Sequence, residues 1–211
     1  VFASQSAQRH HPPFYYALGA LVIAPTQRTD LDAYLQINSL ASLGVDLPGK
    51  LAIFCPGAEY GPAKRWPARH FATLADALAE RGYAVWLLGS AKDRPIAEQI
   101  AGQTRQTPPR NLCGSTSLAQ AIDLLAAASF VVCNDSGLMH VAAALDRPLI
   151  AVYGSSSPGF TPPLSERAQV ISLGLECSPC FKRQCPLQHL DCLNKLEPRR
   201  VLDACLSAAG A

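Results

Sequence analysis

The segment with the clearest chemical potential is Cys133-Asn-Asp-Ser-Gly-Leu-Met-His140, where an apolar strand pattern changes directly into a helical one. Such a junction leaves the amides of the first helical residues without partners inside the helix. Together with the positive end of the helix dipole, those amides favour an anion such as a diphosphate. The residues that we expect to line an anion site at this junction are Asp135, Ser136, Gly137, Leu138 and His140.

Simpler interpretations of the same segment are available. Asp135 could act only as a helix N-cap, and His140 could be a core histidine bonded to a backbone carbonyl. A serine-hydrolase elbow is excluded, because that motif requires a glycine two residues before the serine and Asn134 stands there.

A second candidate is the loop Pro56-Gly-Ala-Glu-Tyr-Gly-Pro-Ala-Lys-Arg-Trp-Pro67, which follows an apolar run. It lacks the Gly-Lys-Ser/Thr ending of a Walker loop. It could nevertheless place Lys64 against a phosphate near a helix N-terminus. The alternative is a solvated loop whose Trp66 packs on the following helix.

Three more strand ends carry small or polar residues. Lys92 or Asp93 could reach a hydroxyl or a phosphate, although Asp93 could equally cap the next helix. A hydroxyl at Ser115, Thr116 or Ser117 suits a ribose or a base edge, but helix capping explains these residues equally well. The Gly-, Ser- and Pro-rich stretch 153–163 suits a loop lining the same cleft.

These loops are separated by alternating strand and helix patterns. The strand patterns are continuous apolar runs, as in a parallel sheet covered by helices on both faces. We expect strands at 51–55, 83–88, 111–113, 130–133, 148–153 and 169–173, and helices at 67–81, 93–103, 118–128, 137–145 and 198–209. The fold class is therefore α/β, a Rossmann-like doubly wound parallel sheet over about 48–208, with ligands beyond the carboxyl ends of the strands.

Composition limits the possible classes. Of 211 residues, 49% are apolar and 16% charged, which excludes intrinsic disorder. A net charge of +2 gives no support to nucleic-acid binding. No apolar run is long enough for a transmembrane helix, and no signal peptide is recognisable. The chain begins at Val1, and 1–47 is poorly patterned apart from a helix end within 14–20, so we expect a fragment or a processed product.

The eight cysteines fall into groups. Cys55, Cys113 and Cys133 lie in or beside apolar segments and are expected to be small buried hydrophobes. A second group has the spacing C-x2-C-x4-C-x6-C, which could hold zinc, although zinc sites usually pair two C-x2-C arms further apart. Unligated thiols or an adventitious disulfide are the alternatives. This second group is Cys177, Cys180, Cys185 and Cys192, and it also allows a zinc-binding interaction or nucleic-acid module.

The motif set resembles the ADP-heptose:lipopolysaccharide heptosyltransferases of glycosyltransferase family 9. The resemblance rests on 56–67, 89–93, 134–144 and 154–163 and covers about 50–208. It is strongest to the type II members, which add the second inner-core heptose. It implies a GT-B fold, with 48–211 as the C-terminal donor-binding domain and 1–47 as a remnant of the N-terminal acceptor domain and connector.

The resemblance also implies roles for individual residues. Lys64 would contact the donor diphosphate, Asp135 would bind heptose hydroxyls, and Thr116 would lie by the nucleoside. His140 would lie near the diphosphate or the sugar. The full expected donor-binding set is Glu59, Tyr60, Lys64, Lys92, Thr116, Asp135, Ser136, Gly137, Leu138 and His140.

The implied reaction is inverting and metal-independent, and requires no cofactor. It moves L-glycero-D-manno-heptose from ADP-heptose to heptosyl-Kdo2-lipid A in the cytoplasm or at the cytoplasmic face of the inner membrane. The catalytic base and the acceptor site are expected in the N-terminal domain, so this chain carries no catalytic residue and alone should transfer little. A different nucleotide-sugar on the same fold is the alternative, since only the motif set favours heptose.

Overall fold

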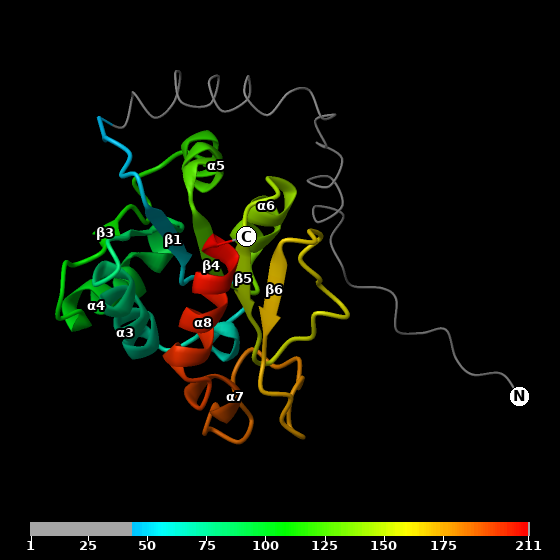
Figure 1. The fold of residues 1–211 in the computed structure, drawn as a ribbon. Helices are drawn as coiled ribbons and strands as arrows, with labels where there is room; N and C mark the ends of the chain where they lie inside the picture. Colours follow the sequence, from blue (N-terminus) through cyan, green and yellow to red (C-terminus); the bar gives the residue numbers. More distant parts are fainter. Residues whose placement is uncertain (1–43, 211) are drawn as a thin grey trace, which may run out of the picture.

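A six-stranded parallel sheet forms the centre of the computed structural model, which describes residues 44–210 (Figure 1). The strand order is β3-β2-β1-β4-β5-β6, and every neighbouring pair is parallel. The strands are β1 (Leu51–Cys55), β2 (Ala84–Leu87), β3 (Arg110–Asn111), β4 (Phe130–Asn134), β5 (Leu149–Val152) and β6 (Ala168–Ile171). The α/β class expected from the sequence is confirmed. The helix end expected within 14–20 lies outside the described residues.

The central strands are apolar throughout because both faces of the sheet are covered. In β1, Ala52 and Phe54 pack into one core, whereas Leu51, Ile53 and Cys55 pack into the other. The same alternation continues along β4 and β5. Successive side chains of a strand point to opposite faces, so a strand between two helical layers needs apolar residues at every position.

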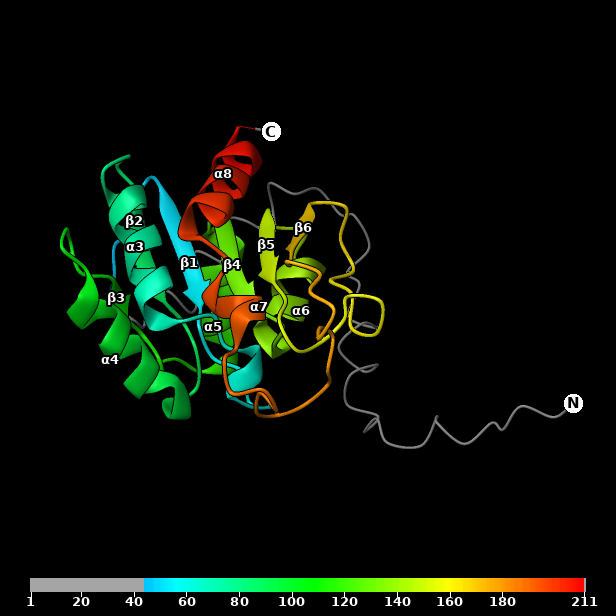
Figure 2. The ribbon, with the colours of Figure 1, turned by 90° about the horizontal axis from the view of Figure 1, so that it is seen from below.

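Helices α3, α4 and α8 cover one face of the sheet, and α5 and α6 cover the other (Figure 2). Their bounds are α3 (Ala68–Ala79), α4 (Arg94–Gln103), α5 (Leu118–Ala127), α6 (Gly137–Ala144) and α8 (Pro198–Ala209). Within 44–210, none of these helices has the length and apolarity that crossing a membrane requires.

The expected elements are all present, with small shifts at their ends. The strand expected at 111–113 is Arg110–Asn111, and the strand expected at 169–173 ends at Ile171. Three short elements were not expected from the sequence, because each is a single turn without a hydrophobic period. They are the 3-10 turns η3 (Pro62–Lys64) and η4 (Ala91–Asp93) and the helix α7 (Asp191–Asn194).

The chain reverses its winding direction between β1 and β4. From β1 it winds outward through β2 to β3, then returns to β4 on the other side of β1 and continues to β5 and β6. In open α/β sheets, ligands bind in the crevice at such a switch point, beyond the carboxyl ends of the strands. A ligand site is therefore expected at the loops after β1 and β4.

Candidate functional site

An ion pair joins those two loops. Lys64 Nζ, from the loop after β1, lies 2.5 Å from Asp135 Oδ2, directly after β4. Both side chains are mostly buried, with exposed fractions of 15% and 4%. The sequence motifs around Lys64 and Asp135 were expected to share one pocket, and the structure brings them into direct contact.

The turn η3 fixes the position of Lys64. The Lys64 amide donates to Gly61 O at 3.2 Å, and the Arg65 amide donates to Pro62 O at 3.0 Å. The Arg65 guanidinium also reaches back to Ala58 O. Lys64 therefore projects from a closed turn instead of a freely moving loop.

Asn134 ties both ends of the loop 56–67 to the end of β4. Its side chain is fully buried, accepts the Trp66 amide at 3.0 Å and donates to Pro56 O at 2.7 Å. Trp66 is also buried, and its indole donates to Leu196 O. Trp66 packs on α3, as the alternative interpretation expected, but the loop is buried and not solvated at this end.

Asp135 has a second partner that was not expected from the sequence. The Thr161 hydroxyl, in the loop after β5, donates to Asp135 Oδ2 at 3.2 Å. The Thr161 carbonyl in turn accepts from the hydroxyl of Tyr153. The carboxylate of Asp135 thus receives donors from loops that follow two different strands.

The N-terminus of α6 opens beside this pair. Ser136 occupies the N-cap in an extended conformation, and its side chain makes no capping hydrogen bond. Helix geometry leaves the first amides, including those of Gly137 and Leu138, without partners inside the helix. A Cβ added at Gly137 would meet nothing within 4 Å, so the space there is open. Asp135 is not the N-cap residue.

His140 lies one turn into α6 and is half-buried. Burial lowers the pKa of His140, the negative charge of Asp135 raises it, and the positive charge of Lys64 lowers it again. The imidazole therefore lies within electrostatic reach of the ion pair and favours the neutral form at pH 7.

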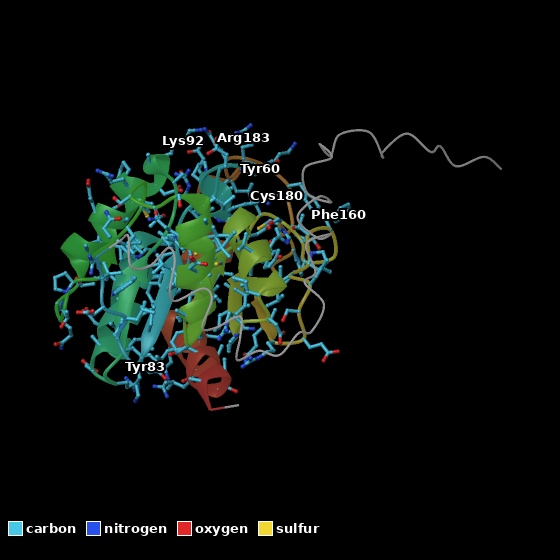
Figure 3. The ribbon with its side chains drawn as sticks, turned by 90° about the horizontal axis from the view of Figure 1, so that it is seen from above. Tyr60, Tyr83, Lys92, Phe160, Cys180 and Arg183 are labelled. Atoms are coloured by element: carbon cyan, nitrogen blue, oxygen red, sulfur yellow. The ribbon has the colours of Figure 1, made fainter. Side chains whose placement is uncertain are left out.

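Three further expected residues lie in the loops after β1 and β2, and Figure 3 labels two of them, Tyr60 and Lys92. The Tyr60 ring lies 4.9 Å from Lys64 Nζ, and its hydroxyl donates to Phe181 O. Glu59 and Lys92 are exposed and pair with each other at 2.7 Å, which lowers the pKa of Glu59. Tyr60 therefore joins the ion pair, whereas Glu59 and Lys92 stand outside it.

Two alternatives from the sequence are resolved by capping geometry. The Asp93 carboxylate accepts from the amide and the hydroxyl of Ser90 in the capping box of η4. Asp93 also occupies the N-cap position of α4, where its side chain makes no capping hydrogen bond. Ser117 caps α5 through reciprocal bonds with Gln120. Thr116 lies after the edge strand β3, and within 44–210 no hydrogen bond or ion pair connects it to Lys64 or Asp135.

The stretch 177–190 folds back over the loop after β1. The Ala63 amide donates to Arg183 O at 3.1 Å, and the Phe181 amide donates to Ser155 O at 2.7 Å. These contacts were not predicted from the sequence, because backbone bonds between positions 120 and 26 residues apart leave no local pattern. In the sequence, this part of the chain stood out only by the spacing of four cysteines over 177–192.

Those four cysteines, Cys177, Cys180, Cys185 and Cys192, line one small hollow together with His189. Across 44–210, however, no three or more His, Cys, Asp or Glu side chains are arranged so that they could hold a metal ion. Burial and then the neighbouring thiols raise the pKa of Cys192 to about 11. Zinc binding by this cluster stays an untested alternative, while Cys55, Cys113 and Cys133 are buried as expected.

Comparison with known proteins identifies the family and the fold. Residues 19–191 match glycosyltransferase family 9 (heptosyltransferase). The chain belongs to this family. The match includes three of the four clustered cysteines, so that cluster lies within a family 9 domain and is not a separate module.

Two members of family 9 that are similar to this chain in sequence are type II heptosyltransferases. Lipopolysaccharide heptosyltransferase 2 of Escherichia coli is 51% identical over 153 residues, covering 71% of this chain and 44% of that protein. Lipooligosaccharide heptosyltransferase 2 of Haemophilus influenzae is 57% identical over 127 residues, covering 57% and 36%. The chain thus spans less than half the length of these relatives.

Solved family 9 structures confirm the architecture. The ADP-heptose LPS heptosyltransferase II of Escherichia coli superposes with a TM-score of 0.72 at 42% identity, covering 87% of this chain and 52% of that one. The Escherichia coli heptosyltransferase WaaC with ADP gives a TM-score of 0.61 at 25% identity, covering 88% and 51%. The described sheet is therefore one half of a GT-B fold.

Proposed function

We propose that this chain is the donor-binding half of a type II heptosyltransferase, which transfers L-glycero-D-manno-heptose from ADP-heptose to the heptosyl-Kdo2-lipid A inner core. The observation that carries the proposal is the Lys64–Asp135 pair beside the open N-terminus of α6, at the switch point of the sheet. The similarity to the type II heptosyltransferase of Escherichia coli supports the type II assignment.

In this proposal the donor diphosphate binds between Lys64 and the first amides of α6. The ammonium and the helix dipole both favour negative charge there. As the bond between sugar and phosphate breaks, charge develops on the departing diphosphate, and fixed donors stabilise it without reorganisation. Asp135 accepts hydrogen bonds from hydroxyls of the sugar. His140, in its neutral form, lies near the diphosphate or the sugar without adding a charge.

The catalytic base belongs, in this proposal, to the part of the relatives that this chain does not cover. The same part holds the lipopolysaccharide acceptor, at the cytoplasmic face of the inner membrane. No metal and no nucleic acid take part. This chain alone therefore binds the donor and transfers little heptose.

Calorimetric titration of the chain with ADP, ADP-heptose and UDP tests the donor assignment. Lys64→Met should weaken ADP binding about tenfold or more, the size of a lost hydrogen bond to a charged group. Asp135→Asn should affect ADP-heptose more than ADP. Lys195→Met is the matched control, because Lys195 is exposed and pairs with Asp191. Unchanged ADP affinity in Lys64→Met would refute the site, and equal binding of UDP would favour another donor.

A transfer assay tests the division of labour. The chain is incubated with ADP-heptose and the heptosyl-Kdo2-lipid A acceptor, and product is followed by mass spectrometry. We expect donor binding without appreciable product. Transfer at a rate typical of enzymes, on the order of 1 per second or faster, would show that the base lies within these 211 residues.

A further inference from the structure

We propose that Thr161 is a positioning residue of the donor site, which holds the Asp135 carboxylate toward the sugar while Lys64 is engaged by the diphosphate, and that Tyr153 holds Thr161 in place. The proposal rests on the proposed function. It assigns a role to the loop after β5, whose Gly, Ser and Pro content suggested only a cleft lining.

The first observation is that one carboxylate oxygen receives two donors. Asp135 Oδ2 accepts from Lys64 Nζ at 2.5 Å and from Thr161 Oγ1 at 3.2 Å. A diphosphate at the N-terminus of α6 competes with Asp135 for the Lys64 ammonium. When the ammonium turns to the phosphate, the Thr161 hydroxyl still donates to Oδ2 and keeps the carboxylate oriented.

The second observation is that hydrogen bonds fix the backbone of Thr161 on both its carbonyl and its amide. Its carbonyl accepts from the Tyr153 hydroxyl, and its amide donates to Ser157 O at 3.2 Å. Tyr153 is only 1% exposed and packs in the core under α6, where its hydroxyl also lies 3.4 Å from the Met139 sulfur. Burial raises the pKa of Tyr153 far above neutral, so the phenol remains a donor.

The third observation concerns the connection between β5 and β6. No helix lies between Val152 and Ala168, although parallel neighbours are usually joined through one. The position of this connection therefore depends on individual contacts such as those of Tyr153 and Thr161, because no helical core face fixes it. The Thr161 hydroxyl, which donates to Asp135, is therefore held in position by Tyr153, whose side chain lies in the core.

Binding measurements on a set of variants test the role. Thr161→Val removes the hydroxyl at nearly constant shape and should weaken ADP-heptose binding about fivefold to tenfold, the size of a hydrogen bond to a charged group. ADP affinity should change less than about twofold, because ADP carries no heptose. Thr161→Ser keeps the hydroxyl and should restore ADP-heptose binding. Thr73→Val, which removes an exposed hydroxyl on α3, is the control.

A double-mutant cycle separates positioning from mere structural support. If Thr161 acts through Asp135, Thr161→Val should cause no further loss in an Asp135→Asn background. Tyr153→Phe should reproduce the selective loss of ADP-heptose affinity in a weaker form. Should Thr161→Val fail to fold, as judged by circular dichroism, Thr161→Ala takes its place in the cycle.

The outcomes distinguish this proposal from the proposed function. A parent chain that binds neither ADP nor ADP-heptose overturns the proposed function. A parent chain that binds both, with Thr161→Val weakening ADP and ADP-heptose equally, overturns the role of Thr161 alone. Additive losses from Thr161→Val and Asp135→Asn do the same, because they show independent action.

Discussion

Among the individual residues, the Lys64–Asp135 pair shows how the site is prepared before a ligand arrives. Burying two charges costs several kcal/mol of desolvation free energy per ion, and a mutual hydrogen bond offsets it only in part. Hydrophobic residues of similar size would stabilise such a position as well or better. Under the proposed function, the pair holds the ammonium at the position where the donor diphosphate would bind.

His70 gives a prediction about pH at the residue scale. It is buried on α3 against the Trp66 ring, and its Nδ1 has no hydrogen-bond partner. Burial first, and then the charge of Arg69, lowers the pKa of His70 below its usual 6.5. The unfolded chain therefore binds a proton at higher pH than the folded one, so the free energy of unfolding should fall as pH drops below about 6.5.

The measurement is urea unfolding of the parent chain and of His70→Gln at pH 7.5 and pH 5.0. The glutamine variant should lose less stability between the two pH values, by up to about 1 kcal/mol, since one pKa unit corresponds to about 1.4 kcal/mol. An equal or steeper loss in His70→Gln would show that other groups set the acid limit.

Site residues that belong to a recognisable local sequence pattern were predictable from the sequence. Asp135 and His140 follow from a strand that turns directly into a helix, and Lys64 from a Gly- and Pro-rich loop before another helix. Thr161 and Asn134 were not predicted, because Thr161 meets a residue 26 positions away and Asn134 meets residues 68 and 78 positions away. Only the folded sheet brings such partners together.

The element that shapes the site most is the turn around η3. Gly61 has a backbone φ of 157° and lies against the backbone of Arg183, where an added Cβ would come within 2.5 Å of the carbonyl oxygen. Both a rare conformation and a backbone neighbour that cannot rotate away require glycine here. The close approach is what lets 177–190 cover the turn that carries Lys64.

Gly61→Ala should therefore destabilise the chain by more than about 1 kcal/mol and weaken ADP binding as Lys64 shifts. The matched control is Gly102→Ala, inside α4, where a Cβ meets nothing within 4 Å. Alanine in a helix should raise stability by roughly 0.5–1 kcal/mol. Thermal unfolding and ADP titration of both variants provide the measurement, and equal effects of the two substitutions would contradict the close-approach argument.

Elements with a hydrophobic period were predictable to within a few residues, and α8 agrees in both bounds. The reason is that a buried strand or an amphipathic helix carries its own pattern. The turns η3 and α7 have three and four residues, too few for any period, and are stabilised by contacts with distant segments.

Across the whole described molecule, two hydrophobic cores lie on opposite faces of one sheet, and together they account for the state of the thiols. Cys55 and Cys133 lie in one core, and Cys113, Cys192 and Cys205 in the other. Burial raises the pKa of Cys113 and of Cys205 to about 12. Neither access nor ionisation favours reaction of these thiols in the folded state.

Alkylation with iodoacetamide, mapped by mass spectrometry, should therefore label exposed Cys177 first. The five core thiols should react only as fast as the chain unfolds. Rapid labelling of Cys133 in the native state would contradict the burial described for β4. If Cys177 were protected until a chelator is added, the zinc site predicted from the spacing of its cluster would be present after all.

The clamp formed by Asn134 has a consequence for chimeric enzymes. A designer who transplants 56–67 from another family 9 member, to alter its preferred nucleotide, moves only part of a composite unit. Compatible residues at 134 and 181–183 must accompany the graft. Residue 134 binds both ends of the loop, and 181–183 contact its middle. Recombination breakpoints placed between these segments would yield well-folded hybrids with a misplaced lysine.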